Sequence, residues 1–225
     1  MTPEAPLPRL PRLTAPKAAA IAGIMFSVLF ITSLVLFLVA LPAKTANAAV
    51  FNAHWQTLML GLNLIPFAGI AFLWFMGVVR DRLGRNEDQF FSTVFFGSGL
   101  LFIAMLFTSA GAAGSLLTLY ANEPNPAIAA SYYAIGRAFA QEIMITYAIR
   151  VAGVFMISTA TLFLRTGVLP RWLSFLGYGL ALTMLFRVGH IDRLGWVALF
   201  FPLWILLISV YVLIDNYGRK VKATL

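Results

Sequence analysis

Hydrophobic and polar positions along the chain alternate between long apolar stretches and short polar connections. The apolar stretches cover residues 18–42, 55–79, 90–119, 133–164, 171–189 and 194–215. At about 1.5 Å per residue, each is long enough to cross a hydrocarbon core about 30 Å thick as a helix. Lipid offers no partner to open backbone groups, and the stretches lack the alternation of an outer-membrane barrel. The pattern therefore predicts an all-α fold, a bundle of six transmembrane helices.

The polar ends and the short loops divide the chain into three parts. Residues 1–17 are rich in proline and are expected to form a disordered tail, residues 18–216 the six-helix transmembrane domain, and residues 217–225 a basic tail. Because the connections are short, consecutive helices are expected to be antiparallel neighbours. No separate soluble domain is predicted, so any chemistry falls to groups on the helices or at their ends.

The distribution of Lys and Arg predicts the orientation in the membrane. With the N-terminus and, after six spans, the C-terminus in the cytoplasm, only Lys44, Arg187 and Arg193 face outward. Inside are then Arg9, Arg12, Lys17, Arg80, Arg82, Arg85, Arg165, Arg171, Arg219, Lys220 and Lys222. This is a strong positive-inside bias.

Composition supports the membrane assignment and limits the function classes. Hydrophobic residues make up 61% of the chain and charged residues 11%, against about half and a quarter in soluble domains. The net charge of +8 is spread over separate loops and tails, which favours anionic lipid at the cytoplasmic face over nucleic acid as a partner. The absence of cysteine excludes disulfides, thiolate metal sites and cysteine nucleophiles.

The end of the first apolar stretch raises the alternative of a cleaved signal peptide. Ala46, Asn47 and Ala48 form an A-x-A site behind the apolar run from Ala18 to Leu41. That run is longer than the roughly 7–15 residues of a signal h-region, so a retained helix is favoured.

Several residues inside the apolar stretches bear on helix packing. Asn63 and Pro66 lie in the middle of the second stretch, where a proline kink beside a polar side chain could form the wall of a pocket. Pro202 lies near the start of the sixth stretch and could bend that helix too. The segment "SAGAAGS", residues 109–115, has side chains small enough for close approach by another helix.

Ionisable residues at membrane depth form the candidate site. Arg150 is 15 residues, or about 22 Å, above Arg165 along the fourth helix, and Arg187 lies at nearly the same depth on the fifth. An Arg facing lipid at depth costs on the order of 3 kcal/mol, so two of them need an anion. The outer-leaflet polar pocket is predicted to comprise Glu142, Arg150, Arg187, His190, Arg137 and Gln141.

Two kinds of anion could neutralise these arginines, an internal carboxylate or a bound ligand. Glu142 and Arg150 are eight residues apart, which in an α-helix separates them by about 80° and argues against a direct pair. Glu142 and Asp192 could instead form an internal network with the arginines, or a carboxylate- or phosphate-bearing ligand could occupy a two-arginine clamp. No cofactor and no metal are expected; a haem held by His54 and His190 is a remote alternative.

The segment "FLRTGVLPRWLSFLGY", residues 163–178, resembles the cytoplasmic turn between the fourth and fifth helices in a group of small bacterial six-helix membrane proteins of unknown function. The first stretch, "AAAIAGIMFSVLF", is similar to that group's opening helix, whereas Ser174 stands where Gly is expected. The resemblance implies a bacterial cytoplasmic-membrane protein and no established activity. The turn also has a physical rationale, since Gly167 can cap one helix and Pro170 can start the next.

The sequence carries no HExxH, P-loop, dinucleotide fingerprint or Ser-His-Asp order. It predicts a non-enzymatic accessory or ligand- and lipid-binding protein, with a membrane protein partner or a second copy of the chain as further possible partners. A small transporter or channel is the second interpretation, although few polar residues continue through the inner half of the bundle. A membrane enzyme acting on a lipid or isoprenoid headgroup is the third.

Overall fold

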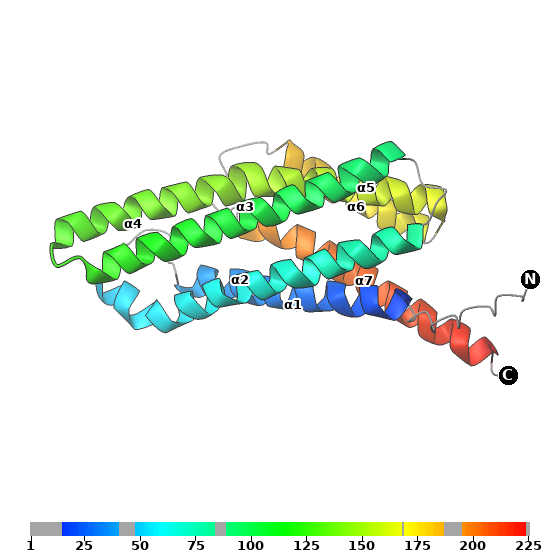
Figure 1. The fold of residues 1–225 in the computed structure, drawn as a ribbon, viewed down its shortest axis with the longest axis horizontal. Coiled ribbons are helices and arrows are strands. Elements are labelled where there is room, and N and C mark those ends of the chain that lie inside the picture. Colours follow the sequence, from blue (N-terminus) through cyan, green and yellow to red (C-terminus); the bar gives the residue numbers. More distant parts are fainter. Residues whose placement is uncertain (1–14, 41–47, 84–88, 168, 187–194, 224–225) are drawn as a thin grey trace, which may run out of the picture.

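A computed structural model describes residues 15–40, 48–83, 89–167, 169–186 and 195–223 of the chain (Figure 1). The described residues are almost entirely helical and contain no strand. The helices are α1 (Ala15–Ala40), α2 (Ala48–Leu83), α3 (Gln89–Asn122), α4 (Pro126–Gln141), the π-helix η1 (Glu142–Ala148), α5 (Ile149–Thr166), α6 (Arg171–Leu185) and α7 (Gly195–Ala223).

Five helical segments in the described part of the chain are long and apolar enough to cross a membrane. They are Ala18–Ala40, His54–Arg80, Gln89–Asn122, Pro126–Thr166 and Val197–Asp215. The predicted all-α class is thereby confirmed for the described residues, and the five long apolar helices are consistent with a helical membrane bundle. The helix α6 has 15 residues, about 22 Å, and the predicted fifth span 171–189 continues into residues 187–194, which lie outside the described residues.

The bundle has two ends of different character. At one end of the bundle α1, α3 and α6 begin and α2, α5 and α7 end (Figure 1). We call it the basic end because it carries Arg80, Arg165 and Arg171. At the other, the hairpin end, α3 turns back into α4. The helix pair of this hairpin extends past α1 in Figure 1.

The hairpin is longer than a bilayer is thick. The helix α3 has 34 residues, and the run through α4, η1 and α5 has 41, or roughly 50 and 60 Å. A hydrocarbon core measures about 30 Å. Both arms of the hairpin are therefore longer than a single membrane span requires.

The helices pack as a closed ring. In the described bundle α1 lies against α2 and α7, and α3 lies between α2 and the continuous helix of α4, η1 and α5. The helix α6 packs chiefly on α5 and touches α7, which completes the ring. Consecutive helices are thus neighbours, as their short connections predicted.

Phenyl rings from five helices fill the centre of this ring. Phe72 of α2 lies with its centroid 4.7 Å from that of Phe26 and 5.1 Å from that of Phe155, and Phe102 lies 4.8 Å from Phe201. We call this group the phenylalanine cluster; its members are Phe26, Phe30, Phe72, Phe75, Phe95, Phe102, Phe155 and Phe201, all fully or almost fully buried. Several of the pairs are edge-to-face, the arrangement that the ring quadrupoles favour.

Side-chain hydrogen bonds to backbone carbonyls join neighbouring helices. Ser33 of α1 donates to the carbonyl of Gly61 at 2.8 Å, and Ser109 of α3 donates to the carbonyl of Ala140 at 2.9 Å. Within the predicted small-residue segment 109–115, Ser109 thus contacts the backbone of another helix, whereas Gly111 is exposed and has no neighbour within 4 Å of an added Cβ. Such bonds contribute about 0.6 kcal/mol each on average in membrane proteins.

The turn between α5 and α6 confirms the sequence interpretation. Gly167 adopts a left-handed conformation with φ of 64°, and its N–H donates to the carbonyl of Phe163 at 3.0 Å. Pro170 then precedes the first residue of α6 as its N-cap. Ser174 is buried in α6, and its hydroxyl oxygen has no hydrogen-bond partner among the described residues.

The first and last helices are longer than the sequence predicted, and the prolines of the second and sixth apolar stretches lie within helices. The helix α1 already begins at Ala15, and α7 continues to Ala223 through most of the predicted basic tail. Pro66 and Pro202 both lie inside continuous helices. Of the predicted A-x-A site, Ala46 and Asn47 lie outside the described residues.

Candidate functional site

The predicted polar residues of the fourth helix are spread along its middle, from Arg137 to Arg150. Arg137 and Gln141 lie on α4, Glu142 opens the π-helix, and Arg150 lies in the first turn of α5. Gln141, Glu142 and Arg150 are exposed and Arg137 is partly exposed. Within the part of the chain that is described, these residues occupy the surface of the bundle and not an internal pocket.

The predicted site residues that follow α6 lie outside the part of the chain that the structure describes. Arg187 and His190, together with Asp192, lie in the stretch 187–194, outside the described residues. The two-arginine clamp and the Glu142/Asp192 network therefore stay predictions.

The helix widens into a π-helix between Glu142 and Ala148. The N–H of Ile149 donates to the carbonyl of Met144, five residues back, where an α-helix would use the carbonyl four residues back. A π turn has the effect of one residue inserted into an α-helix, and such turns are frequent at functional sites. The π-helix was not predicted from the sequence.

The π-helix changes which residues share a face. Because the π turn inserts one residue, the eight residues from Glu142 to Arg150 turn the chain as far as seven residues of an α-helix would. Seven α-helical residues make almost two full turns, so the two side chains lie about 20° apart around the helix axis. The expected separation of 80° assumed an α-helix and is wrong. Glu142, Tyr147 and Arg150 consequently form one exposed line, which we call the polar stripe.

The guanidinium of Arg150 folds back along its own helix. Its Nη1 donates to the carbonyl of Thr146 at 2.8 Å. Side chains of a helix lean toward its N-terminus, which here is the hairpin end, so the charge is carried about one turn nearer that end than its Cα. This is the geometry of an arginine that reaches from hydrocarbon depth toward a headgroup region.

Two side-chain donors bond backbone carbonyls in or just before the π-helix. Arg150 bonds the carbonyl of Thr146 within the π-helix, and Ser109 of α3 bonds the carbonyl of Ala140 before it. A change from four-residue to five-residue bonding disturbs the regular pairing of backbone groups, and polar side chains can supply the missing donors. Through these two bonds, α3 and the polar stripe both contact the backbone in or beside the π-helix.

Glu142 and Arg150 form no ion pair with each other among the described residues. Their Cα atoms are separated by about 10 Å along the axis, and the fold-back of Arg150 brings its guanidinium to within about 6 Å of the level of Glu142. The stripe thus presents a positive and a negative group one above the other, both open to the surroundings.

Two further candidates lie on α2. Asn63 and Pro66 are exposed, so they face away from the bundle interior and do not wall an internal pocket. His54 is partly buried at the start of the second span. No group of three or more His, Cys, Asp or Glu side chains gathers within the described residues, and His190, the other proposed haem ligand, is not among them.

The basic end holds two contacts that the sequence did not reveal. The guanidinium carbon of Arg80 lies 5.0 Å from the ring centroid of Phe96, and that of Arg165 lies 4.7 Å from the ring centroid of Phe91. The sequence assigned both arginines to membrane topology alone. No short-range motif links either arginine to a ring, because the partners lie on different helices.

The described residues form an all-α bundle with a polar stripe on one long helix, and its long apolar helices suggest a multi-pass membrane protein. Comparison with family models, curated proteins and solved structures finds no match for the chain. The resemblance of residues 163–178 to small bacterial six-helix membrane proteins therefore stays a sequence-based expectation.

Proposed function

We propose that the chain is a six-span protein of a bacterial cytoplasmic membrane, with both termini in the cytoplasm, that binds a lipid headgroup without catalysing a reaction. The observation that carries this proposal is the exposed Arg150, whose guanidinium is held at the carbonyl of Thr146. Counted from Arg165 at the basic end, Arg150 lies about 22 Å into a core about 30 Å thick. At that depth an exposed guanidinium meets lipid and, by leaning outward, the headgroups of the outer leaflet.

The stripe suits a headgroup that carries both a phosphate and an amine. One Nη atom of Arg150 is used by the Thr146 carbonyl, and the remaining N–H groups are available to phosphate oxygens. Glu142 lies above Arg150 on the same line and would accept hydrogen bonds from a primary ammonium. Phosphatidylethanolamine has these two groups in this order from the acyl chains outward.

Transport through the bundle is less well supported. The phenylalanine cluster lies at the centre of the ring of helices, where a permeation path would need polar groups or a cavity. The serine and threonine hydroxyls of the inner half, such as those of Ser158, Thr159 and Thr161, donate to carbonyls of their own helix. These contacts favour a binding or accessory role.

Lipid binding to the purified protein tests the proposal. Native mass spectrometry would compare phosphatidylethanolamine and phosphatidylglycerol on the wild type, Arg150→Leu and Glu142→Gln, with Arg137→Gln as the matched control farther along the same helix. Arg150→Leu is expected to weaken binding of both lipids about tenfold, in line with loss of a charge-assisted hydrogen bond. Glu142→Gln is expected to remove the preference for the amine-bearing lipid, and Arg137→Gln to change neither.

Unchanged lipid occupancy in Arg150→Leu would overturn the proposal. An equal loss in Arg137→Gln would also overturn it, because the effect would then reflect net charge and not the stripe.

A further inference from the structure

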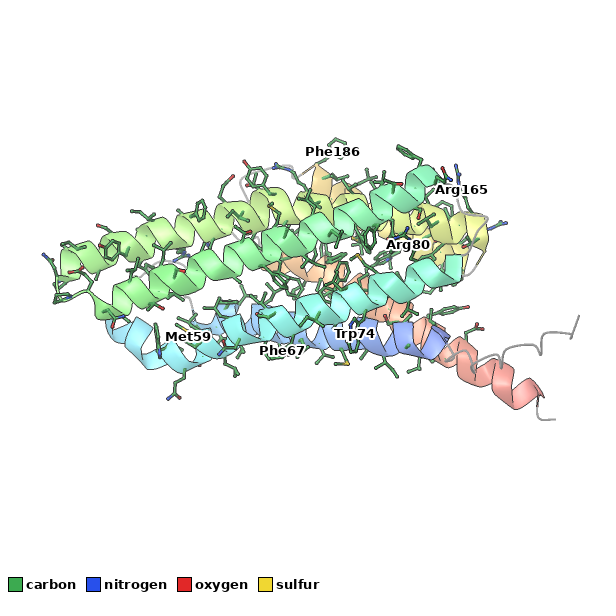
Figure 2. The ribbon with its side chains drawn as sticks, in the orientation of Figure 1. Met59, Phe67, Trp74, Arg80, Arg165 and Phe186 are labelled. Carbon is green, nitrogen blue, oxygen red and sulfur yellow. The ribbon has the colours of Figure 1, made fainter. Side chains whose placement is uncertain are left out.

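The side chain of Asn63 lies on the outer face of α2. In the described bundle α2 packs chiefly against α1 and α3, and Asn63 is exposed, so it lies on the side that neither neighbour covers. Phe67, on the same side, points outward in Figure 2. The exposed hydroxyls of Thr108 and Thr183 donate to carbonyls of their own helices, whereas the Asn63 amide forms no hydrogen bond among the described residues.

This amide lies within the apolar part of its helix. Counted from Arg80 at the basic end, Asn63 is 17 residues away, or about 25 Å, in a core about 30 Å thick. At that depth the helix meets hydrocarbon, where an amide without a partner is costly. Arg150 is long enough to lean out to the headgroups, but asparagine is too short to do so. Asn63 therefore needs a partner from outside the described bundle.

The backbone beside Asn63 supplies a further acceptor. Pro66 has no N–H, so the carbonyl of Leu62 lacks the donor that an α-helix supplies four residues later. Pro66 is exposed, which places this carbonyl toward the outer face of α2. The face thus offers the N–H groups of the amide and two kinds of carbonyl oxygen at one level.

Exposed residues repeat every seven positions along this face. Gln56, Asn63, Ile70 and Gly77 are all exposed. Seven residues of an α-helix make almost two full turns, so the four lie in one row, which we call the α2 line. Its apolar members suit lipid as well as protein, but its two amides do not. Seven residues is also the repeat of helices that pair along their length.

The amides of the α2 line are complementary to themselves. An amide has both donors and an acceptor, so it pairs with an identical amide. Two copies of one chain that cross the membrane in the same direction are related by a two-fold axis along the membrane normal, and each residue near that axis meets its own counterpart. Asparagine and glutamine side chains form such hydrogen bonds between helices in membranes.

We propose that a second copy of the chain packs on the α2 line to form a parallel dimer. The two Asn63 side chains meet at the axis and hydrogen-bond each other or the Leu62 carbonyl across it. The guanidinium of Arg80, which follows the line, is held over the ring of Phe96 of α3, so the two positive charges are turned away from the axis. The dimer rests on the membrane-spanning character of α2 and not on the lipid site at Arg150.

Association in liposomes tests the proposal. The chain has no cysteine, so Ser131→Cys, at an exposed position of α4, provides a single site for a donor or an acceptor dye. Energy transfer between chains would be measured as the protein-to-lipid ratio is lowered. In this background Asn63→Leu is expected to weaken association about three- to tenfold, as for loss of an interhelical hydrogen bond. Asn63→Gln keeps an amide and should retain most of the association.

Thr183→Val is the matched control, because it removes an exposed polar group from α6, and it is expected to leave association unchanged. Disulfide formation gives a second measurement that reports position. Gln56→Cys, at the hairpin end of the α2 line, is expected to form a linked dimer under oxidation, whereas unlabelled Ser131→Cys is not.

Three results would overturn the proposal. The first is energy transfer in the wild-type background that is no greater than in Asn63→Leu at every dilution, which would leave the α2 line to lipid or to a different protein. The second is an equal loss of association in Thr183→Val. The third is equal cross-linking of Gln56→Cys and Ser131→Cys, since the contact would then be random.

Discussion

The indole N–H of Trp204 donates a 3.1 Å hydrogen bond to the carbonyl of Leu173, which joins α7 to the first turn of α6. Trp204 is fully buried, and its ring lies against Gly177 of α6. A Cβ added at Gly177 would come within 2.6 Å of a ring carbon. The small residue and the indole therefore form one joint between two helices that otherwise touch little.

Two substitutions at this joint should differ in cost. Trp204→Phe removes the donor and is expected to lower the free energy of unfolding by about 0.6–1.7 kcal/mol. Gly177→Ala forces the ring to move and is expected to cost about 1–3 kcal/mol. Unfolding in mixed detergent micelles would measure both, with Trp172→Phe as the control, because that ring is exposed. Equal stability of wild type and Gly177→Ala would contradict the close contact.

Removing one residue from the π-helix should be tolerated. Deletion of Ile143 turns the π turn into an α turn and leaves the faces on both sides in register, since the wide turn counts as one inserted residue. Deletion of Ile157, in the α-helical part of α5, rotates everything before it by about 100° relative to the core. We expect the first variant to fold with nearly wild-type thermal stability and the second to misfold. The reverse order of stabilities would refute the register assignment.

The centre of the phenylalanine cluster should be the most sensitive part of the bundle to truncation. Phe155 lies 4.9 Å from Phe95 and 5.7 Å from Phe201, centroid to centroid. Phe155→Ala is expected to cost about 3–5 kcal/mol, as for large cavities in packed cores. Phe67→Ala, at a position 62% exposed on α2 and directed outward in Figure 2, is the control. A loss of similar size in both variants would show that the cluster has no special role.

The hairpin should depend on the hydrogen bond between Ser109 and the carbonyl of Ala140. Ser109→Ala is expected to speed hydrogen exchange across η1, because α3 no longer supplies a donor beside the π turn. The free energy of unfolding should fall by about 0.6–1.7 kcal/mol. Thr108→Ala is the control, since Thr108 is exposed and bonds a carbonyl of its own helix. Unchanged exchange in Ser109→Ala would mean that this bond does not hold the π-helix.

Much of the architecture could be predicted because the lipid environment leaves few alternatives. Apolar length alone located the helices, and Gly167 with Pro170 located the turn between α5 and α6. The π-helix could not be predicted, because "EIMITYA" is equally compatible with an α-helix and the choice depends on packing against α3. The direction of the Arg150 side chain and the stacking of Arg80 and Arg165 on Phe96 and Phe91 likewise depend on tertiary geometry.

The phenylalanine cluster also limits how the protein can move. A carrier that exposes its substrate to each side of the membrane in turn needs two alternative packings of its helices about a central site. Here eight rings from α1, α2, α3, α5 and α7 interlock at one point, and a close-packed interior resists gradual sliding. The close-packed rings thus join these five helices at one level, which opposes the sliding of one helix past another that such a carrier would need.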